Sequence, residues 1–317
     1  MKKSLIALAV AGAFAAPAFA ASSNVDIYGK IRASVDYIDN DANSESVWQI
    51  NDRVSRIGFK GSEDLGGGLK AVWQIESGLT FDGAGAMGGA GLRNTFVGVA
   101  GGFGTALIGR HDTPYKLAGS ADVFVDTAAD AQDTNGIIGS GGFDTRATNT
   151  IAYISPDFSG LHFAAAIVPG ESTAAGTNAN DLMDAYSLAA VYKNGPLNGS
   201  LAWEDHNDIA DESAWKANVG YAFGDLKVGA TYEDQSRGNG DDRTAWLVSA
   251  AYGMGPISLL AQYGDRDSDV AANDLTRWTL GVGYALSKRT STYIAYNSDE
   301  RNNVDSSVIT MGVNHDF

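Results

Sequence analysis

Residues 25–35 read VDIYGKIRASV, a run in which apolar or small side chains alternate with polar ones. Similar alternation recurs in LKAVWQIE at 69–76, LKVGATYE at 226–233 and RWTLGVGY at 277–284. A period of two residues is typical of β-strands, because successive side chains point to opposite faces of a sheet. Helical spacing is not sustained after residue 24, so the sequence predicts an all-β protein.

The connections between these stretches alternate strictly between short and long. The short turns lie at residues 64–67, 101–104, 156–159, 194–196, 223–225, 253–256 and 287–288. The long polar connections lie at residues 39–47, 79–91, 111–145, 169–184, 205–213, 234–243, 264–274 and 298–305. Seven short and eight long connections imply sixteen antiparallel strands.

An even number of strands, with tight turns on one rim and long loops on the other, indicates a transmembrane β-barrel. A soluble β-sandwich gives no reason for this asymmetry, whereas lipid excludes open sheet edges and therefore selects a closed barrel. We expect one rim to carry Asp64, Gly102, Asp157 and Gly195. The side chains expected to face lipid include Ile57, Phe59, Trp73, Val228 and Leu280.

The N-terminus has the pattern of a secretory signal peptide. A basic start precedes an apolar run over residues 5–16 and a small-x-small cleavage site at residues 18–20. The apolar run is shorter than the ~20 residues that a membrane-spanning helix needs. We therefore expect residues 1–20 to be cleaved and residues 21–317 to form a single barrel domain.

The composition excludes several classes of protein. The formal net charge is -16, which argues against a nucleic-acid partner, because nucleic acids require basic surfaces. The chain contains no cysteine, and no stretch after the signal peptide has the 18 apolar residues of a membrane-spanning helix. The glycine pattern at residues 83–88 is not followed by a helix, and Asp265, Asp267 and Asp269 lack the later glycine and glutamate of a calcium-binding EF-hand. We expect no cofactor and no metal centre, while binding of divalent ions to the acidic outer loops stays open.

Several segments carry a more specific resemblance. They read VDIYG at residues 25–29, SRIGFKGSEDLG at 55–66, YISPDF at 153–158 and GVNHDF at 312–317, with further matches at 93–98 and 109–110. On these segments the chain resembles the general porins of Gram-negative bacteria, most closely those of proteobacteria. Asn314 departs from the pattern, because many relatives carry a basic residue there.

The resemblance implies a sixteen-stranded barrel in the cell outer membrane, usually assembled as a homotrimer, whose water-filled channel passes small hydrophilic solutes and ions by passive diffusion. It also implies that the third long loop folds into the lumen as a constriction. Outer-membrane lipid would surround the barrel. The terminal aromatic residue, Phe317, is what such barrels offer to their assembly machinery.

The residues of the third long loop agree with this expectation independently. The segment 111–145 is the longest connection by a wide margin, and long structureless segments on a compact fold are usually functional. Its apolar residues need burial, which favours a segment folded into the barrel over a disordered surface excursion. These residues are Phe124, Val125, Ile137, Ile138 and Phe143.

Charged residues on the polar faces of the strands should line the pore, because a lysine or arginine facing lipid at mid-depth costs ~2–4 kcal/mol. The candidate basic wall consists of Lys30, Arg32, Arg56, Arg93 and Arg146. The candidate acidic set on the long loop consists of Asp122, Asp126, Asp130 and Asp133. By resemblance, Arg56 and Arg93 match the basic ladder of porins, and the first three aspartates match their acidic loop. Opposed walls of this kind create a transverse field across the constriction.

The balance of charge predicts weak ion selectivity. Acidic outer loops attract cations to the mouth, while the basic wall favours anions where the pore is narrowest. Exposed charges act over a Debye length of ~8 Å at physiological salt, so the effect of the mouth fades as salt rises. With four loop aspartates nearly cancelling the basic wall, we expect weak cation preference at low salt that shrinks towards neutrality.

Three other functions compete with a general pore. A substrate-specific channel is the strongest of these, although the sequence shows no aromatic run of the kind that lines sugar-specific channels. A barrel hydrolase needs a serine and histidine pair, and no serine partner is evident beside any of the four histidines. An adhesin or anchor would suit a plugged barrel, whereas sixteen strands leave an aqueous channel. We therefore expect a channel and not an enzyme.

Overall fold

The computed structural model describes residues 25–40, 45–81, 91–133, 135–171, 181–206 and 211–317. The predicted signal peptide and the glycine pattern at 83–88 lie outside these residues. The strands are β1 (Val25–Asn40), β2 (Val47–Asp52), β3 (Arg56–Gly66), β4 (Leu69–Gly78), β5 (Thr95–Gly101), β6 (Gly104–Asp112), β7 (Arg146–Ile154), β8 (Leu161–Val168), β9 (Ala185–Asn194), β10 (Leu197–His206), β11 (Glu212–Phe223), β12 (Leu226–Ser236), β13 (Arg243–Met254), β14 (Ile257–Ser268), β15 (Leu275–Ala285), β16 (Thr290–Arg301) and β17 (Val304–Asp316). The helical elements are α2 (Pro114–Leu117), η1 (Ser140–Gly142) and η2 (Ala271–Asn273). No helix within the described ranges is long and apolar enough to cross a membrane.

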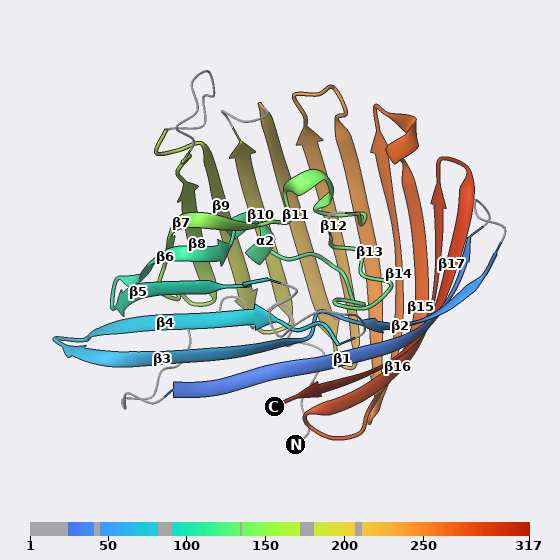
Figure 1. Ribbon diagram of the computed structural model, residues 1–317, viewed down its shortest axis with the longest axis horizontal. Helices are drawn as coiled ribbons and strands as arrows, with labels where there is room; N and C mark the ends of the chain where they lie inside the picture. Colours follow the sequence, from blue (N-terminus) through green and yellow to red (C-terminus); the bar gives the residue numbers. More distant parts are fainter. Residues whose placement is uncertain (1–24, 41–44, 82–90, 134, 172–180, 207–210) are drawn as a thin grey trace.

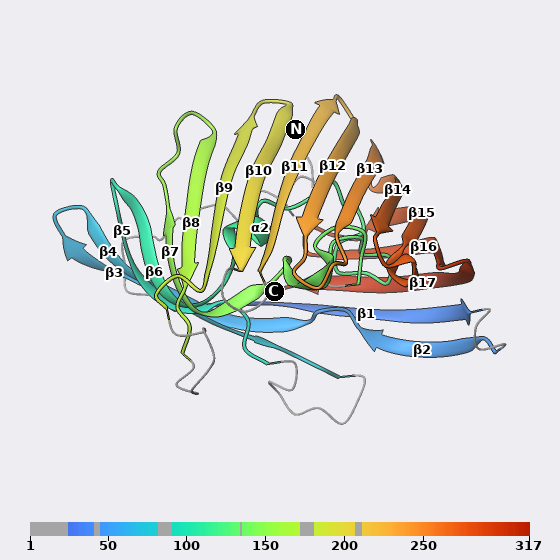
Figure 2. The ribbon, with the colours of Figure 1, turned by 90° about the horizontal axis from the view of Figure 1, so that it is seen from above.

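All these strands form one antiparallel sheet that closes on itself (Figures 1 and 2). From β3 to β17 each strand pairs with its neighbours along the chain. β1 pairs with β17 from Lys30↔Asp316 to Asn40↔Ser306. β2 and β3 pair with successive parts of β1, so the two together make one barrel strand. Over the residues that the structure describes, the predicted barrel of sixteen antiparallel strands is therefore confirmed.

The second barrel strand is interrupted between β2 and β3, which the sequence did not predict. On β1, two residues separate the partner of Asp52 from the partner of Arg56, whereas the second strand has three residues, 53–55, in the same interval. One extra residue on one strand is a β-bulge, which re-aims the side chains around it. Val54 adopts a left-handed φ of 59° at this point. Because of the extra residue, Arg53 and Arg56 both point to the inner face, although regular alternation would put them on opposite faces.

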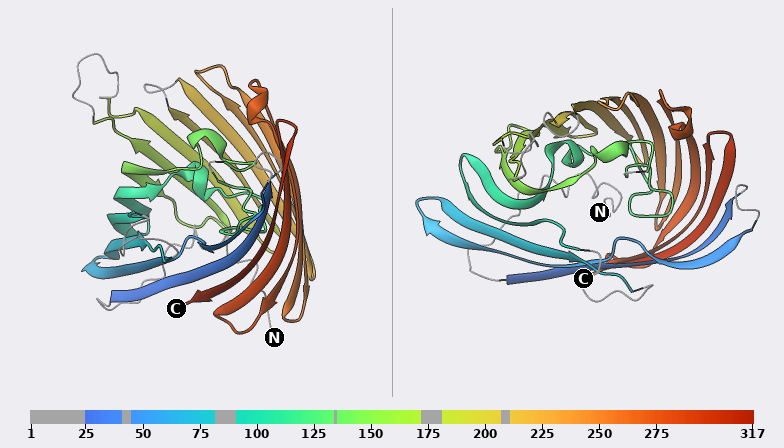
Figure 3. Two further views of the ribbon diagram at one scale, coloured as in Figure 1. Left: turned by 45° about the vertical axis from the view of Figure 1, so that its right-hand side comes forward. Right: turned by 45° about the horizontal axis from the view of Figure 1, so that its top comes forward.

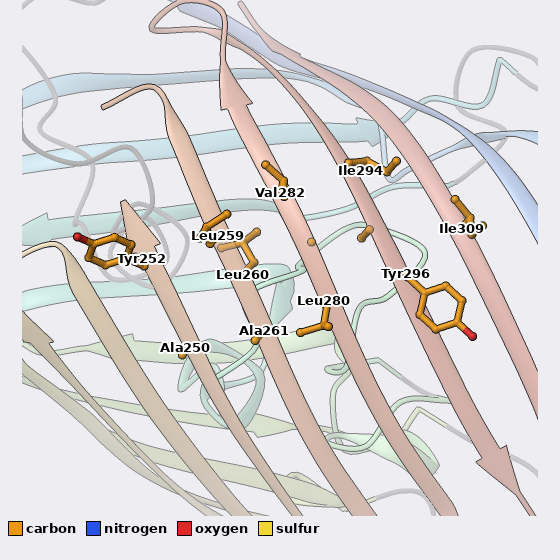
Figure 4. Close-up of a pocket in the computed structure, with 12 residues that line it drawn as sticks. Ala250, Tyr252, Leu259, Leu260, Ala261, Leu280, Val282, Ile294, Tyr296 and Ile309 are labelled. Atoms are coloured by element: carbon orange, nitrogen blue, oxygen red, sulfur yellow. The ribbon is translucent and has the colours of Figure 1, made fainter. Parts of the chain in front are cut away.

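The outer face of the barrel is apolar, as the alternation predicts. Phe59, Val228 and Leu280 have exposed fractions of 37%, 38% and 55% in the isolated chain, and lipid would cover them. Ile57 and Trp73 belong to the same face and have intermediate exposure. Over β13–β17 the outward side chains form a shallow apolar groove, part of which is drawn in Figure 4.

A belt of aromatic side chains crosses the outer face near the rim of the long loops. Its members are Trp215, Tyr232, Trp246, Tyr263, Trp278 and Tyr296, which lie on the consecutive strands β11 to β16. Tyr232 pairs directly with Trp246, and Tyr263 pairs directly with Trp278. Ring centroids of the diagonal neighbours lie 5.1–5.3 Å apart. Tyrosine and tryptophan concentrate where a membrane meets water, so this belt marks one interface of the membrane.

The seven short turns lie where the sequence predicts them, and antiparallel connectivity places Asp64, Gly102, Asp157 and Gly195 on one rim. The prediction of a long connection at 298–305 is wrong. β16 runs to Arg301 and β17 starts at Val304, so only Asn302 and Asn303 connect the two strands. Both asparagines have positive φ, 49° and 60°. Two such residues suit the type I′ turn that closes a tight hairpin, so the polar residues on either side belong to the strands.

The two faces of β4 offer a matched test of the barrel. Ile75 is 48% exposed on the outer face, while the adjacent Gln74 faces the lumen and donates to the main-chain oxygen of Asn94 (3.2 Å). We expect Ile75→Lys to lower the free energy of unfolding in vesicles by about 2–4 kcal/mol, because the charge faces lipid, and Gln74→Lys to have a much smaller effect. Urea titration of the folded barrel measures both. An equal or larger loss for Gln74→Lys would contradict the assignment of the two faces.

Candidate functional site

The segment between β6 and β7 lies against the inner face of the barrel wall (Figure 3). We call it the inserted segment; its described residues are 113–133 and 135–145. It starts with Thr113, whose hydroxyl caps α2 by accepting from the main-chain nitrogen of Lys116 (3.3 Å), and it includes η1 before it reaches β7. Its apolar side chains pack on inward-facing residues of the wall. Ile137 and Ile138 are fully buried beside Leu247 and Leu275.

Four of the five apolar residues that were expected to be buried are buried. Phe143 is fully buried with Tyr115 against small residues of β9, β10 and β11. Phe124 is buried with Ala295 of β16. The expectation is wrong for Val125, which is 41% exposed. The segment is therefore anchored to the wall at several points by its apolar side chains. Val125 is not among these anchors, and its side chain is exposed.

Hydrogen bonds join the main chain of this segment to polar side chains of the wall. The hydroxyl of Ser200 on β10 donates to the oxygen of Ala118 (2.8 Å). At Ala121 the main-chain nitrogen donates to the hydroxyl of Thr231 on β12 (2.7 Å), and the oxygen accepts from Ser249 on β13 (2.5 Å). These partners lie on β10, β12 and β13, so they hold residues 118–121 against the same side of the wall as the apolar contacts.

Asp126 is the predicted loop acid that meets the predicted basic wall. Its carboxylate lies 2.5 Å from Nη1 of Arg32 and 3.4 Å from Nη1 of Arg56. Burial by itself would raise the pKa of Asp126, but Arg32 and Arg56 outweigh this effect and hold that pKa below its usual value. The carboxyl therefore stays ionised at more acidic pH than an ordinary aspartate.

Arg93 and Arg146 also lie on the inner face, but their partners are carboxylates of the wall. Nε of Arg93 lies 2.6 Å from Oε1 of Glu76 on β4. Nη2 of Arg146 lies 2.8 Å from Oδ1 of Asp112, at the end of β6. Lys30 is the remaining member of the predicted basic wall. Its Nζ lies 4.0 Å from Oδ1 of Asp316, the last residue of β17.

The other predicted loop acids do not oppose the arginines. Asp122 accepts from the main-chain nitrogens of Phe124 (2.7 Å) and Ala131 (2.9 Å), and Asp130 accepts from those of Asp126 (2.6 Å) and Gln132 (2.8 Å). Burial and the nearby Asp122 carboxylate raise the pKa of Asp130 well above its usual value.

Asp133 is exposed and accepts from the main-chain nitrogen of Asn135 (2.6 Å). Three of the four predicted acids therefore shape the segment itself, and Asp126 alone among them forms ion pairs with the basic wall in the described structure.

Sequence reasoning missed two groups at this site. Glu76 binds both Arg93 and the hydroxyl of Tyr28 (2.9 Å). Arg53 forms an ion pair with the buried carboxylate of Asp36 and donates to Ser34 (2.9 Å). Glu76 was recognisable as an inward charge on a strand. Arg53 was not recognisable from regular alternation, because the bulge turns its side chain to the opposite face. The cost of placing an arginine in lipid was nevertheless a signal that the alternation is irregular at this position.

Each of the four histidine rings has a nitrogen within 3.0 Å of an oxygen of a residue that is not serine. Nδ1 of His111 lies 2.8 Å from the oxygen of Asp112, and Nε2 of His162 lies 3.0 Å from Asp157. Nε2 of His206 lies 3.0 Å from Glu204, and Nδ1 of His315 lies 2.9 Å from the hydroxyl of Thr290. In the described parts of the chain, no three or more histidine or carboxylate side chains are grouped to hold a metal ion.

The arrangement divides the inner wall into two unlike halves. The inserted segment packs on the inner face of the wall from β8 to β16. The wall from β1 to β7 instead presents arginines and carboxylates, most of them partly exposed. A closed barrel with an apolar outside, an aromatic belt and a charged lumen defines an outer-membrane β-barrel protein.

Comparison with known proteins identifies its family. The sequence model of the Gram-negative porin family matches residues 7–304, and the chain belongs to this family. It is 36% identical over 203 residues to the major outer membrane protein P.IB of Neisseria gonorrhoeae, covering 61% of this chain and 54% of that protein. It is 33% identical over 250 residues to the outer membrane porin protein 32 of Delftia acidovorans, covering 73% of this chain and 66% of that protein.

The fold is similar to that of a solved porin along nearly its whole length. The anion-selective porin from Comamonas acidovorans superposes with a TM-score of 0.78 at 25% sequence identity, covering 93% of this chain and all of that one. The sequence matches to the two curated relatives are less complete. The chain spans between about half and two thirds of the length of those proteins.

A designed disulfide tests the position of the inserted segment. A Cβ added to Gly229 on β12 would lie 3.1 Å from Cβ of Ala121, slightly closer than the roughly 3.5–4.5 Å of a disulfide. The chain has no native cysteine, so Ala121→Cys with Gly229→Cys creates the only possible pair within one chain. We expect it to close on mild oxidation, which gel mobility and intact mass would detect. The two single variants are the controls, and a pair that stays reduced would place the segment away from β12.

Proposed function

We propose that this protein is a general diffusion channel, through which small hydrophilic solutes and ions cross the outer membrane passively. The observation that carries the proposal is the ion pairing of Asp126, on the inserted segment, with Arg32 and Arg56 on the opposite part of the wall. The segment would narrow the lumen at this level. Charges on both sides of the narrow region would orient polar solutes and disfavour apolar ones.

The protein belongs to a family of channels rather than enzymes, in agreement with the prediction that it is not an enzyme. A conductance measurement tests the channel directly. In planar bilayers, we expect single-channel conductance to rise in proportion to the conductivity of potassium chloride solutions. In swelling of loaded vesicles, uptake should fall steeply with sugar size and should not saturate with concentration. Saturation by one sugar, together with block of the ion current by that sugar, would instead support a substrate-specific channel.

The partners of the loop acids change the expected ion selectivity. Asp122, Asp130 and Asp133 were expected to cancel the basic wall, but their carboxylates bind the main chain of the segment. The narrow region then holds four arginines, Arg32, Arg56, Arg93 and Arg146, beside three paired carboxylates, Asp126, Glu76 and Asp112. We propose a net anion preference there, which agrees with the description of the Comamonas acidovorans porin as anion-selective.

Selectivity should therefore depend on salt. At low salt the acidic outer loops offset the arginines. At high salt the effect of the exposed loop charges is screened, whereas the paired, partly buried charges of the lumen are screened much less. We expect reversal potentials in potassium chloride gradients to move towards anion preference as salt rises. Arg56→Ala should reduce the preference and Asp126→Asn should increase it. The control is Asp157→Asn on the short-turn rim, and an Arg56→Ala variant with unchanged potential would contradict the assignment.

The effect of Asp126→Asn has a defined pH range. The pKa of Asp126 in the folded protein lies below its usual value, so the pairing with Arg32 and Arg56 is fully present above the unfolded value of about 3.9 and is lost only as the pH falls through the lower folded value. The difference between the variant and the original protein should therefore be constant from neutral pH to about pH 4.

We propose that the barrel assembles as a homotrimer, with the assembly machinery reading the strand that ends at Phe317. The family resemblance supports the trimer, and the apolar outer wall offers surface for it. Native mass spectrometry in detergent, with chemical cross-linking in membranes, tests the assembly. A species of one subunit in both experiments would contradict it.

A further inference from the structure

Five arginines on the covered side of the barrel reach the inserted segment from consecutive elements of the wall. They are Arg237 after β12, Arg243 on β13, Arg266 on β14, Arg277 on β15 and Arg301 on β16, and we call them the arginine row. None of them was predicted from the sequence as a site residue. Arg32 and Arg56 of the basic wall pair with a carboxylate of the segment. Four of the five arginines in the row instead donate to a main-chain oxygen of the segment.

The contacts fall on five residues of the segment between positions 130 and 141. Nη1 of Arg277 donates to the oxygen of Asp130 (2.5 Å), and Nη2 of Arg301 donates to the oxygen of Asn135 (3.2 Å). The oxygens of Gly136 and Gly141 accept from Nη1 of Arg266 and of Arg237 (2.8 Å for Arg237), and Nη1 of Arg243 donates to the hydroxyl of Ser140 (3.3 Å).

Three members of the row share one geometry. Nε and Nη2 of Arg277 bind the two carboxylate oxygens of Asp299 (2.7 and 2.6 Å), its direct cross-strand partner. In Arg243, Nε and Nη2 bind the carboxylate of Asp241. In Arg266 they bind the main-chain oxygen of Asn273 (3.1 and 2.8 Å). One edge of each guanidinium is therefore fixed, by β16 for Arg277 and by the adjoining loops for Arg243 and Arg266, and Nη1 is left to point at the segment.

This geometry requires arginine. The guanidinium is planar and carries five donors in a fixed fork, so binding one edge sets the direction of the remaining amino group. A lysine in the same place has one nitrogen at the end of a flexible chain, and it can satisfy the wall acceptor or the segment but does not hold a fixed direction between them. Main-chain oxygens keep their accepting capacity whatever side chains the segment carries and at any pH.

We propose that the arginine row positions the inserted segment across the lumen, with Arg277 and Arg266 as its principal positioning residues. The two are 8% and 3% exposed and stand on the neighbouring strands β15 and β14. Arg277 lies two residues along β15 from Leu275, which belongs to the apolar cluster of Ile137 and Ile138. The row fixes one side of residues 130–141, while Asp126 meets Arg32 and Arg56 on the other side. This inference rests on the proposed role of the segment as the constriction, but the position of the segment can be measured separately from the current.

The test uses a spin label on the segment in the full-length barrel. Asn135 is exposed, and the chain has no other cysteine, so Asn135→Cys accepts one label. We expect Arg277→Lys and Arg266→Lys to increase the mobile fraction of the label roughly tenfold, because each loses a charge-assisted hydrogen bond to the segment. Open-channel current noise should rise in the same variants. The matched control is Arg289→Lys, an exposed arginine in the turn on the opposite rim.

Asp299→Asn provides a second route that leaves every arginine in place. It weakens the orientation of Arg277, so it should mobilise the label by less than Arg277→Lys and add little to it in the double variant. If labels in all three variants stay as immobile as in the control while the barrels are folded, the inference is overturned. If the label becomes mobile and the current does not change, the arginine row positions the segment as proposed, and the segment is not the constriction.

Discussion

Main-chain polar groups that cross the lipid layer must all be paired within the protein, and the architecture of this barrel follows from that requirement. Hydrocarbon offers no hydrogen-bond partner, so a sheet that crosses it must have no open edge. Here the edge is removed by the ladder between β1 and β17, which runs over Lys30 to Asn40. The chain has no disulfide to assist it. Once the sheet closes, one face of each strand meets lipid and the other meets the lumen.

Closure explains why charge collects inside the barrel. Outward positions carry apolar and aromatic residues, and the charged residues of the strands therefore converge on the lumen. The bulge at residues 53–55 follows the same rule, because it turns Arg53 inward to the buried carboxylate of Asp36. A lumen lined in this way is wet and polar, and its field is set by which charges lie unpaired at its narrowest level.

The inserted segment gives the lumen its asymmetry. Ile137, Ile138 and Phe143 need burial, and the inner face of β9–β16 provides it. Arginine serves two purposes on the two sides of the segment. Arg32 and Arg56 oppose a carboxylate where solutes would pass. Arg266 and Arg277 instead donate to main-chain oxygens of the segment, so they hold it in place and do not present a free charge to solutes.

The strands, the seven short turns, the outward faces and the long segment between β6 and β7 were predictable from the sequence, because each is encoded by local periodicity or by the polarity of a short stretch. The connection at 298–305 was predicted too long, because polar residues on both sides of Asn302 and Asn303 belong to strands. The ion pairs were not predictable, because they depend on how distant parts of the chain fold together. The four loop aspartates have the same side chain: Asp122, Asp126, Asp130 and Asp133. Because the main chain of the segment is irregular, no sequence period tells which of them points towards the basic wall. Asp126 meets Arg32 and Arg56 across 94 and 70 residues of sequence, a contact that exists only because the barrel closes and the segment folds back within it.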